Sequence, residues 1–226
     1  TPTPPAFSPQ SGPGNDGPHF LTQCAAMESP RGGTRLPYLL LIIVYAALLL
    51  ARGEAWNATG IDEIHYYAQG ATLLWDADLD LTNDFLESRN DYPLRLEMAG
   101  RLFRNGEPDL PFPIGMAFLQ MPFSYVAKGL DAVTGWRLGA SDRYTYFHRL
   151  VPSLLTWAAV LLGLLAVMRV GERFAGPWPA FSIALLLFLG TNLSFYTWHA
   201  NAMAHGMSFA LGALTTLAAL RLSERP

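Results

Sequence analysis

The sequence has few charged residues and a single cysteine, and both shortages narrow the class of protein. Charged side chains make up 15% of the 226 residues, whereas ordinary globular domains carry about 25%. Cys24 has no second cysteine to join in an intrachain disulfide, so it gives no information about redox compartment. No cluster of Lys and Arg suggests a nucleic-acid partner.

Hydrophobic residues make up 51% of the chain, and four windows contain almost no charge. Each window is close to the roughly 20 residues that span the hydrocarbon core of a bilayer. We therefore predict an all-α, polytopic integral membrane protein with crossings at about 36–51, 150–168, 179–196 and 203–220. The amphipathic segment 113–130 is expected to lie in the membrane interface, and a fifth crossing there stays open.

The N-terminal residues 1–35 are rich in Pro, Gly and Ser and are predicted to be disordered. The first residue is Thr, so we expect a fragment or an upstream extension, with Met27 as an alternative start. The apolar helix after Met27 resembles a signal sequence as well as an anchor. No convincing A-x-A site follows Ala51, which favours a retained helix.

The positions of the arginines predict which side of the membrane each segment faces. Arg31 and Arg35 precede the first crossing, and by the positive-inside rule they place the N-terminus in the cytoplasm. The segment 52–112, with twelve Asp and Glu against five Arg, is then a long extracytoplasmic loop.

A helix from about Glu63 to Trp75 is predicted in this loop, because apolar residues recur at helical spacing at positions 64, 67, 68, 71, 74 and 75. Asp62 would be its N-cap and Glu63 would lie in its first turn. Asp is a favoured N-cap residue, and Glu in the first turn interacts favourably with the helix dipole. A structural role and a functional role for the pair stay open on spacing alone.

Three stretches resemble one family. "GIDEIHYYAQGATLLWDADLDLTNDF" resembles the first outer loop of GT-C glycosyltransferases, such as protein mannosyltransferases and aminoarabinose transferases. "LPFPIGMAFLQMPFSYVAKGL" is similar to their proline-marked juxtamembrane helix. The stretch from "RLVPSLL" to "SFALGAL" is similar to the next two helices and the second outer loop. The resemblance covers residues 36–222 and implies the N-terminal part of a GT-C module, with 223–226 as a truncated end.

The resemblance implies a transferase that moves a sugar from a polyprenyl-phosphate donor to an acceptor at the extracytoplasmic side of a bacterial plasma membrane. The acceptor, a lipid, glycan or protein, is not identified. Asp62 is the expected base or acceptor-orienting carboxylate, and Glu63 is the second choice. Arginines suit phosphate contacts, and histidines near the membrane entry suit donor or acceptor contacts. The expected substrate-binding residues are His65, Arg95, Arg101, His199 and His205.

No metal site is predicted with assigned ligands. Asp76, Asp78, Asp80 and Glu87 have the spacing of a calcium loop, but Leu81 stands where the turn requires glycine. Many family members have an acidic residue in the second outer loop, where this chain has histidines and an asparagine. This departure argues against a metal-assisted mechanism that needs a second carboxylate there, and a divalent metal as cofactor stays open.

The alternative function is non-catalytic: a membrane transporter or a lipid-handling subunit with an acidic outer loop. A structural membrane protein without a ligand is a second alternative. Transporters place charged or helix-breaking residues near the midplane of their crossings. The middle of each of the four predicted crossings lacks a charged residue, which favours a site at the membrane surface.

Overall fold

The computed structural model describes most of the chain from the first predicted crossing onward. The described residues belong to one unit, Gly33–Pro226. They are residues 35–51, 61–78, 80, 103–104, 107–108, 114–135, 146–201 and 203–224. The predicted disordered segment, 1–35, lies outside the described residues except for Arg35.

Helices make up most of the described residues, which confirms the all-α class in its coarse form. Within this part of the chain, a short antiparallel pair of strands, β1 (Phe103–Arg104) and β2 (Glu107–Pro108), is the exception. The helices are α2 (Arg35–Ala51), α3 (Ile61–Trp75), α6 (Gly115–Thr134), α7 (Tyr146–Ala175), α8 (Pro177–Gly190), α9 (Leu193–Trp198) and α10 (Ala204–Ser223).

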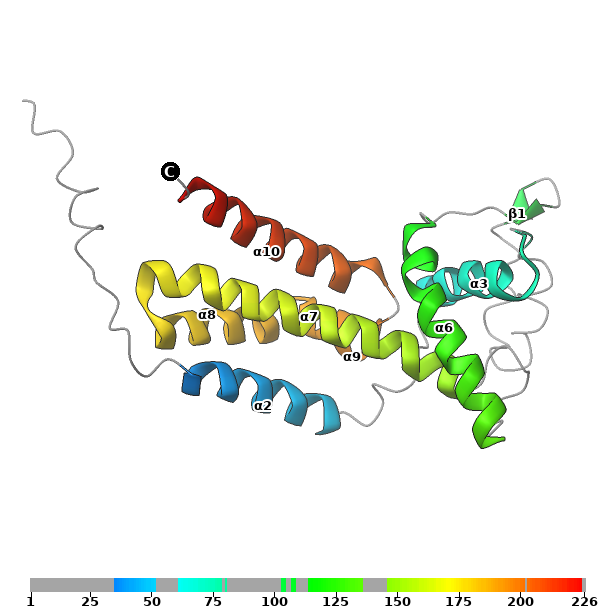
Figure 1. Ribbon diagram of the computed structural model, residues 1–226, viewed down its shortest axis with the longest axis horizontal. Helices are drawn as coiled ribbons and strands as arrows, with labels where there is room; N and C mark the ends of the chain where they lie inside the picture. Colours follow the sequence, from blue (N-terminus) through cyan, green and yellow to red (C-terminus); the bar gives the residue numbers. More distant parts are fainter. Residues whose placement is uncertain are drawn as a thin grey trace, which may run out of the picture. The chain divides into compact units, whose positions relative to one another are not determined.

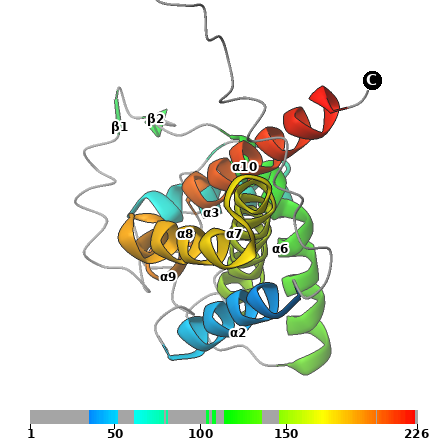
Figure 2. The ribbon, with the colours of Figure 1, turned by 90° about the vertical axis from the view of Figure 1, so that its left-hand side faces the viewer.

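The 30-residue helix α7 is the centre of the packing. It contacts α2, α8 and α10, and these three helices surround it in Figures 1 and 2. Val160, Leu164 and Met168 of α7 are fully buried, and their spacing of four residues puts them on one face of the helix. Leu41 of α2 and Phe188 of α8 belong to the same core cluster.

Two glycines allow α7 and α10 to approach closely. A Cβ atom at Gly163 of α7 would lie 3.0 Å from the Cα atom of Ala210. A Cβ atom at Gly206 of α10 would lie 2.7 Å from Cγ2 of Thr156. Small residues at such contacts are typical of helix packing in membranes, and a larger side chain would push the helices apart.

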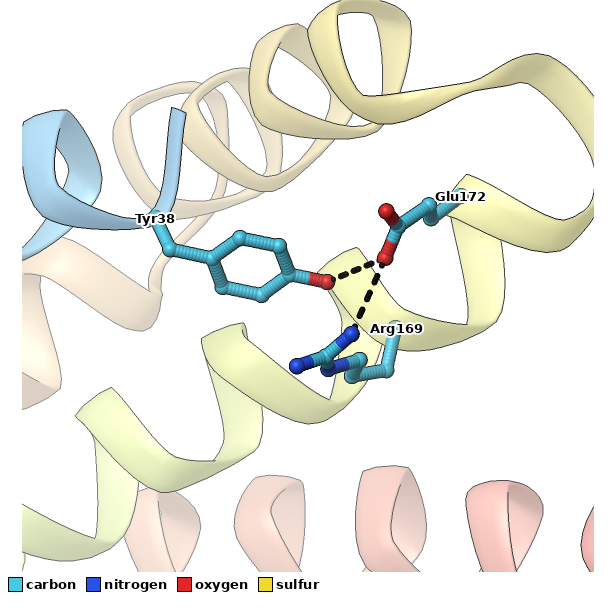
Figure 3. Close-up of polar contacts among 3 residues, drawn as sticks. All are labelled: Tyr38, Arg169 and Glu172. Atoms are coloured by element: carbon cyan, nitrogen blue, oxygen red, sulfur yellow. Dashed lines mark hydrogen bonds and ion pairs between the residues drawn. The ribbon is translucent and has the colours of Figure 1, made fainter. Parts of the chain in front are cut away.

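Polar contacts fix the directions of these helices. The Tyr38 hydroxyl near the start of α2 donates to Glu172 Oε2 near the end of α7, at 2.7 Å (Figure 3). The two helices are therefore antiparallel. Arg173, also near the end of α7, forms an ion pair with Glu224 just after α10, so α7 and α10 run in the same direction. Together these residues define the charged end of the helix group, which consists of α7 and the helices α2, α8, α9 and α10 packed on it.

The opposite end of the group is held by uncharged polar contacts. The Tyr45 hydroxyl of α2 donates to the carbonyl oxygen of Trp157 at 2.9 Å. The indole Nε1–H of Trp157 donates to the carbonyl oxygen of Thr197 in α9 at 2.8 Å. These bonds bring the end of α8 and the short helix α9 beside the N-terminal half of α7.

The helix lengths agree with the predicted crossings only in part. Among the described helices, α7 and α10 are long and apolar enough to cross a membrane, whereas α2 and α8 are apolar but shorter. A buried core helix of a soluble protein passes the same test of length and composition. The membrane location therefore stays a prediction.

The expected crossing 179–196 is not one continuous helix. Helix α8 ends at Gly190, where Thr191 adopts an extended conformation, and α9 begins at Leu193. The Thr191 hydroxyl donates to the carbonyl oxygen of Leu187 and accepts from the N–H of Leu193. One side chain thus satisfies backbone groups on both sides of the break, as a helix cap does.

The expected interfacial segment 113–130 contains one helix, α6, despite Pro122 in its interior. The proline lacks an N–H group and leaves the carbonyl oxygen of Phe118 without its usual helical partner. Both residues lie on the exposed side of the helix, which makes this loss tolerable. The helix continues to Thr134 and ends at Gly135, whose φ of 63° is the left-handed conformation that favours glycine.

Candidate functional site

A buried carboxylate and imidazole meet where α6 packs against α7. His148 Nδ1 lies 3.0 Å from Asp131 Oδ2, and the two side chains are 1% and 12% exposed. His148 is in the first turn of α7, and Asp131 is in the last turn of α6. A carboxylate that accepts from Nδ1–H fixes the orientation and the tautomer of the imidazole ring.

Helix α3 joins this contact through an aromatic side chain. The Trp75 ring lies 6.0 Å from the His148 ring, measured between centroids. Lys128 Nζ lies 3.6 Å from the centroid of the Trp75 ring, a cation–π contact. Lys128 and Asp131 are three residues apart and share a face of α6. Trp75, Lys128, Asp131 and His148 are called the junction cluster below.

Uncharged polar side chains continue the buried surface between α3 and α6. Gln69 and Thr72 of α3 are 1% and 0% exposed, and Gln120 and Ser124 of α6 are 1% and 3% exposed. Thr72 Oγ1 donates to Asp78 Oδ1 at 2.7 Å. This bond links Asp78, one of the aspartates with calcium-loop spacing, to the end of α3.

The Asp78 carboxylate also accepts the backbone N–H of Asp80 at 3.1 Å. These bonds fit a closed turn after α3. Within the described ranges, which exclude Glu87, no group of three or more His, Cys, Asp or Glu side chains is arranged to hold a metal ion.

A second buried polar contact joins α7 to the loop before α10. The Ser153 hydroxyl lies 2.9 Å from Asn201 Oδ1, and both side chains are at most 1% exposed. This contact brings the loop at Asn201 beside the N-terminal third of α7, where His148 also lies. The loop and the junction cluster therefore share one end of the helix group.

The predicted residues His199 and His205 flank this loop. His205 is exposed and stacks on Tyr196, with ring centroids 4.1 Å apart and an interplanar angle of 28°. His199 lies beside Phe195, at 5.6 Å between ring centroids. Each histidine has its own aromatic neighbour, and both belong to the same end of the group as the junction cluster.

The predicted catalytic pair lies in the first turn of α3. The helix begins at Ile61, so the prediction that Asp62 is the N-cap is wrong: Asp62 is the second residue of the helix and Glu63 the third. The side chains of Asp62, Glu63 and His65 lie outside the described residues. Arg95 and Arg101 also lie outside the described residues.

Sequence reasoning missed Asp131 and His148. His148 immediately precedes the apolar window that begins at 150, and an ionisable side chain at a membrane entry is a functional candidate by default. The same argument selected His205 and would have selected His148. Asp131 had no such signal, because an acidic residue on an amphipathic helix is usually solvated.

Comparison with known proteins adds no relative: no protein-family model, no curated protein and no solved structure matches this chain. The chemistry is therefore argued from its own side chains. One end of the helix group gathers an imidazole–carboxylate pair, two further histidines and the helix that carries Asp62 and Glu63. Such groups position hydroxyls, transfer protons and bind anions.

Proposed function

We propose that this protein is part of a GT-C-type membrane glycosyltransferase that moves a sugar from a polyprenyl-phosphate donor to an extracytoplasmic acceptor. One observation carries the proposal: chemically capable groups that are far apart in sequence belong to one end of the helix group. The Trp75 end of α3 contacts His148, and the loop between His199 and His205 contacts Ser153 through Asn201.

The arrangement supports a surface site rather than a path through the helices. Phosphate on the donor is already a good leaving group, so the protein needs to orient an acceptor hydroxyl, receive its proton and balance the phosphate charge. Asp62 is assigned to the acceptor or to the developing charge on the sugar, with Glu63 as the second choice. Arg95, Arg101 and the histidines are assigned to substrate binding.

The charge distribution supports the sidedness of this proposal. Arg35, Arg169 and Arg173 belong to the charged end, where Tyr38 meets Glu172. A cluster of arginines at one end of apolar helices fits the cytoplasmic side of a membrane. The site then lies at the opposite, extracytoplasmic side.

Transfer from a labelled donor tests the function. Membranes that contain the protein are incubated with undecaprenyl-phosphate mannose carrying radiolabel in the sugar, and label is measured in the lipid, glycan and protein fractions. Undecaprenyl-phosphate aminoarabinose is the second probe. Asp62→Asn should abolish most of the transfer, and Val133→Ala, an 86% exposed position on α6, is the matched control. Donor binding without transfer to any fraction would favour the lipid-handling alternative.

A further inference from the structure

We infer that Asp131 and His148 are positioning residues of the proposed active site, which hold α3 in place on the end of α7. The inference rests on the proposed function. Neither residue belongs to the predicted catalytic pair or to the predicted substrate contacts, and they act through the helix that carries Asp62 and Glu63.

The packing makes α6 the support of α3. The two helices are closely packed: Ala68 of α3 and Ala117 of α6 are both fully buried, and a Cβ atom at Gly70 would lie 3.8 Å from the carbonyl oxygen of Ala117. Helix α6 in turn packs on α7. The placement of α3 on the helix group therefore depends on the contact between α6 and α7.

The Asp131–His148 bond suits orientation better than stability. Burying a polar or charged pair has a desolvation cost that offsets most of the attraction between the partners. Replacing both partners with apolar residues therefore often leaves the free energy of unfolding unchanged. A hydrogen bond is directional, however, and it fixes the angle as well as the distance between its partners. At 3.0 Å between Nδ1 and Oδ2, the bond favours the observed arrangement of α6 on α7 over arrangements that would break it.

Because α3 is long, a change in its orientation at Trp75 produces a larger displacement at its other end. Asp62 and Trp75 are thirteen positions apart, which is about 20 Å along a helix at 1.5 Å per residue. A small tilt at Trp75 therefore displaces the start of the helix by an ångström or more. Misplacement of a catalytic group by about 1 Å costs about 100-fold in rate.

Two substitutions at His148 separate positioning from direct chemistry. The side-chain amide of Asn places an N–H near the position of Nδ1, whereas that of Gln places it near Nε2. His148→Gln should lower kcat for transfer from undecaprenyl-phosphate mannose by about 100-fold with little change in KM. His148→Asn, which keeps a donor for Asp131, should restore most of the rate. Val133→Ala should behave as wild type.

A distance measurement tests the same inference without an enzymatic readout. Spin labels are attached at Leu73→Cys on α3 and at Leu154→Cys, a 45% exposed position on α7, after replacement of Cys24 by Ser. His148→Gln should broaden the distribution of distances between the labels, and His148→Asn should keep it narrow.

Each outcome decides one question. Equal loss of transfer in both His148 variants, or an unchanged distance distribution in His148→Gln, overturns the positioning role. If the wild-type protein transfers no sugar from either donor, the proposed function fails, and the spin-label distances still decide whether Asp131 and His148 hold α3.

Discussion

Tyr38 and Glu172 are 134 positions apart in the sequence, and the hydroxyl of one donates to the carboxylate of the other at 2.7 Å (Figure 3). Arg169 completes the contact: its Nη1 lies 3.3 Å from the same carboxylate oxygen, and its guanidinium carbon lies 4.6 Å from the centroid of the Tyr38 ring. The three side chains join the start of α2 to the end of α7.

Tyr38→Phe should weaken this join. A hydrogen bond to a charged group contributes about 1.5–3 kcal/mol, but Arg169 still pairs with Glu172, so we expect a loss of about 1 kcal/mol in the free energy of unfolding. Thermal unfolding of the detergent-solubilised protein measures it. Tyr125→Phe on α6, where the side chain is 55% exposed, is the control, and an equal loss there would contradict the role of Tyr38.

Gly163→Ala should separate α7 from α10. The added Cβ atom would lie 2.6 Å from Cε1 of Phe209 and 3.0 Å from the backbone of Ala210, and overpacking of this kind costs about 1–3 kcal/mol. At Gly212 of α10 a Cβ atom meets nothing within 4 Å. Gly212→Ala should therefore be neutral or slightly stabilising, since alanine favours helix by about 1 kcal/mol over glycine. The melting temperature of Gly163→Ala should lie below that of the wild type, and that of Gly212→Ala should equal or slightly exceed it.

The proposed topology predicts two reporter results. A reporter fused after Ala175 should be cytoplasmic, and one fused after Asn201 should be extracytoplasmic. Ala175 ends α7 beside the charged end, whereas Asn201 contacts Ser153 near the other end of the same helix. Fusions scored by phosphatase and fluorescent-protein activity make the measurement. The same side for both positions would exclude the four-crossing arrangement.

Asp62→Asn should affect activity far more than folding. The residue lies in the first turn of α3, so loss of its charge removes about 0.3–1 kcal/mol of helix-dipole stabilisation. Loss of a general base typically lowers the rate by about 100- to 10,000-fold, which is about 3–5 kcal/mol in barrier height. Glu63→Gln should cost less. Thermal stability and sugar transfer are compared in one preparation, and a stable Asp62→Asn protein with wild-type turnover would leave Asp62 with a helix-stabilising role alone.

The sequence by itself determined the helical class and most helix positions. Apolar residues at helical spacing predicted the helix after residue 60, which runs from Ile61 to Trp75. Charge-poor windows predicted α2, α7 and α10, because a helix that is apolar around its whole circumference is typical of a membrane crossing or of a buried core helix. These features depend on short-range spacing, which a single sequence contains.

The tertiary structure decided which of these helices meet and which polar side chains contact one another. The pairing of Tyr38 with Glu172 and that of Ser153 with Asn201 depend on the directions of packed helices, and no local pattern encodes those directions. The break at Thr191 also escaped prediction, because hydropathy does not register a side chain that bonds to backbone groups of two helices. The position of His148 before an apolar window is visible in the sequence, but its burial and its partner Asp131, 3.0 Å away on another helix, are visible only in the tertiary structure.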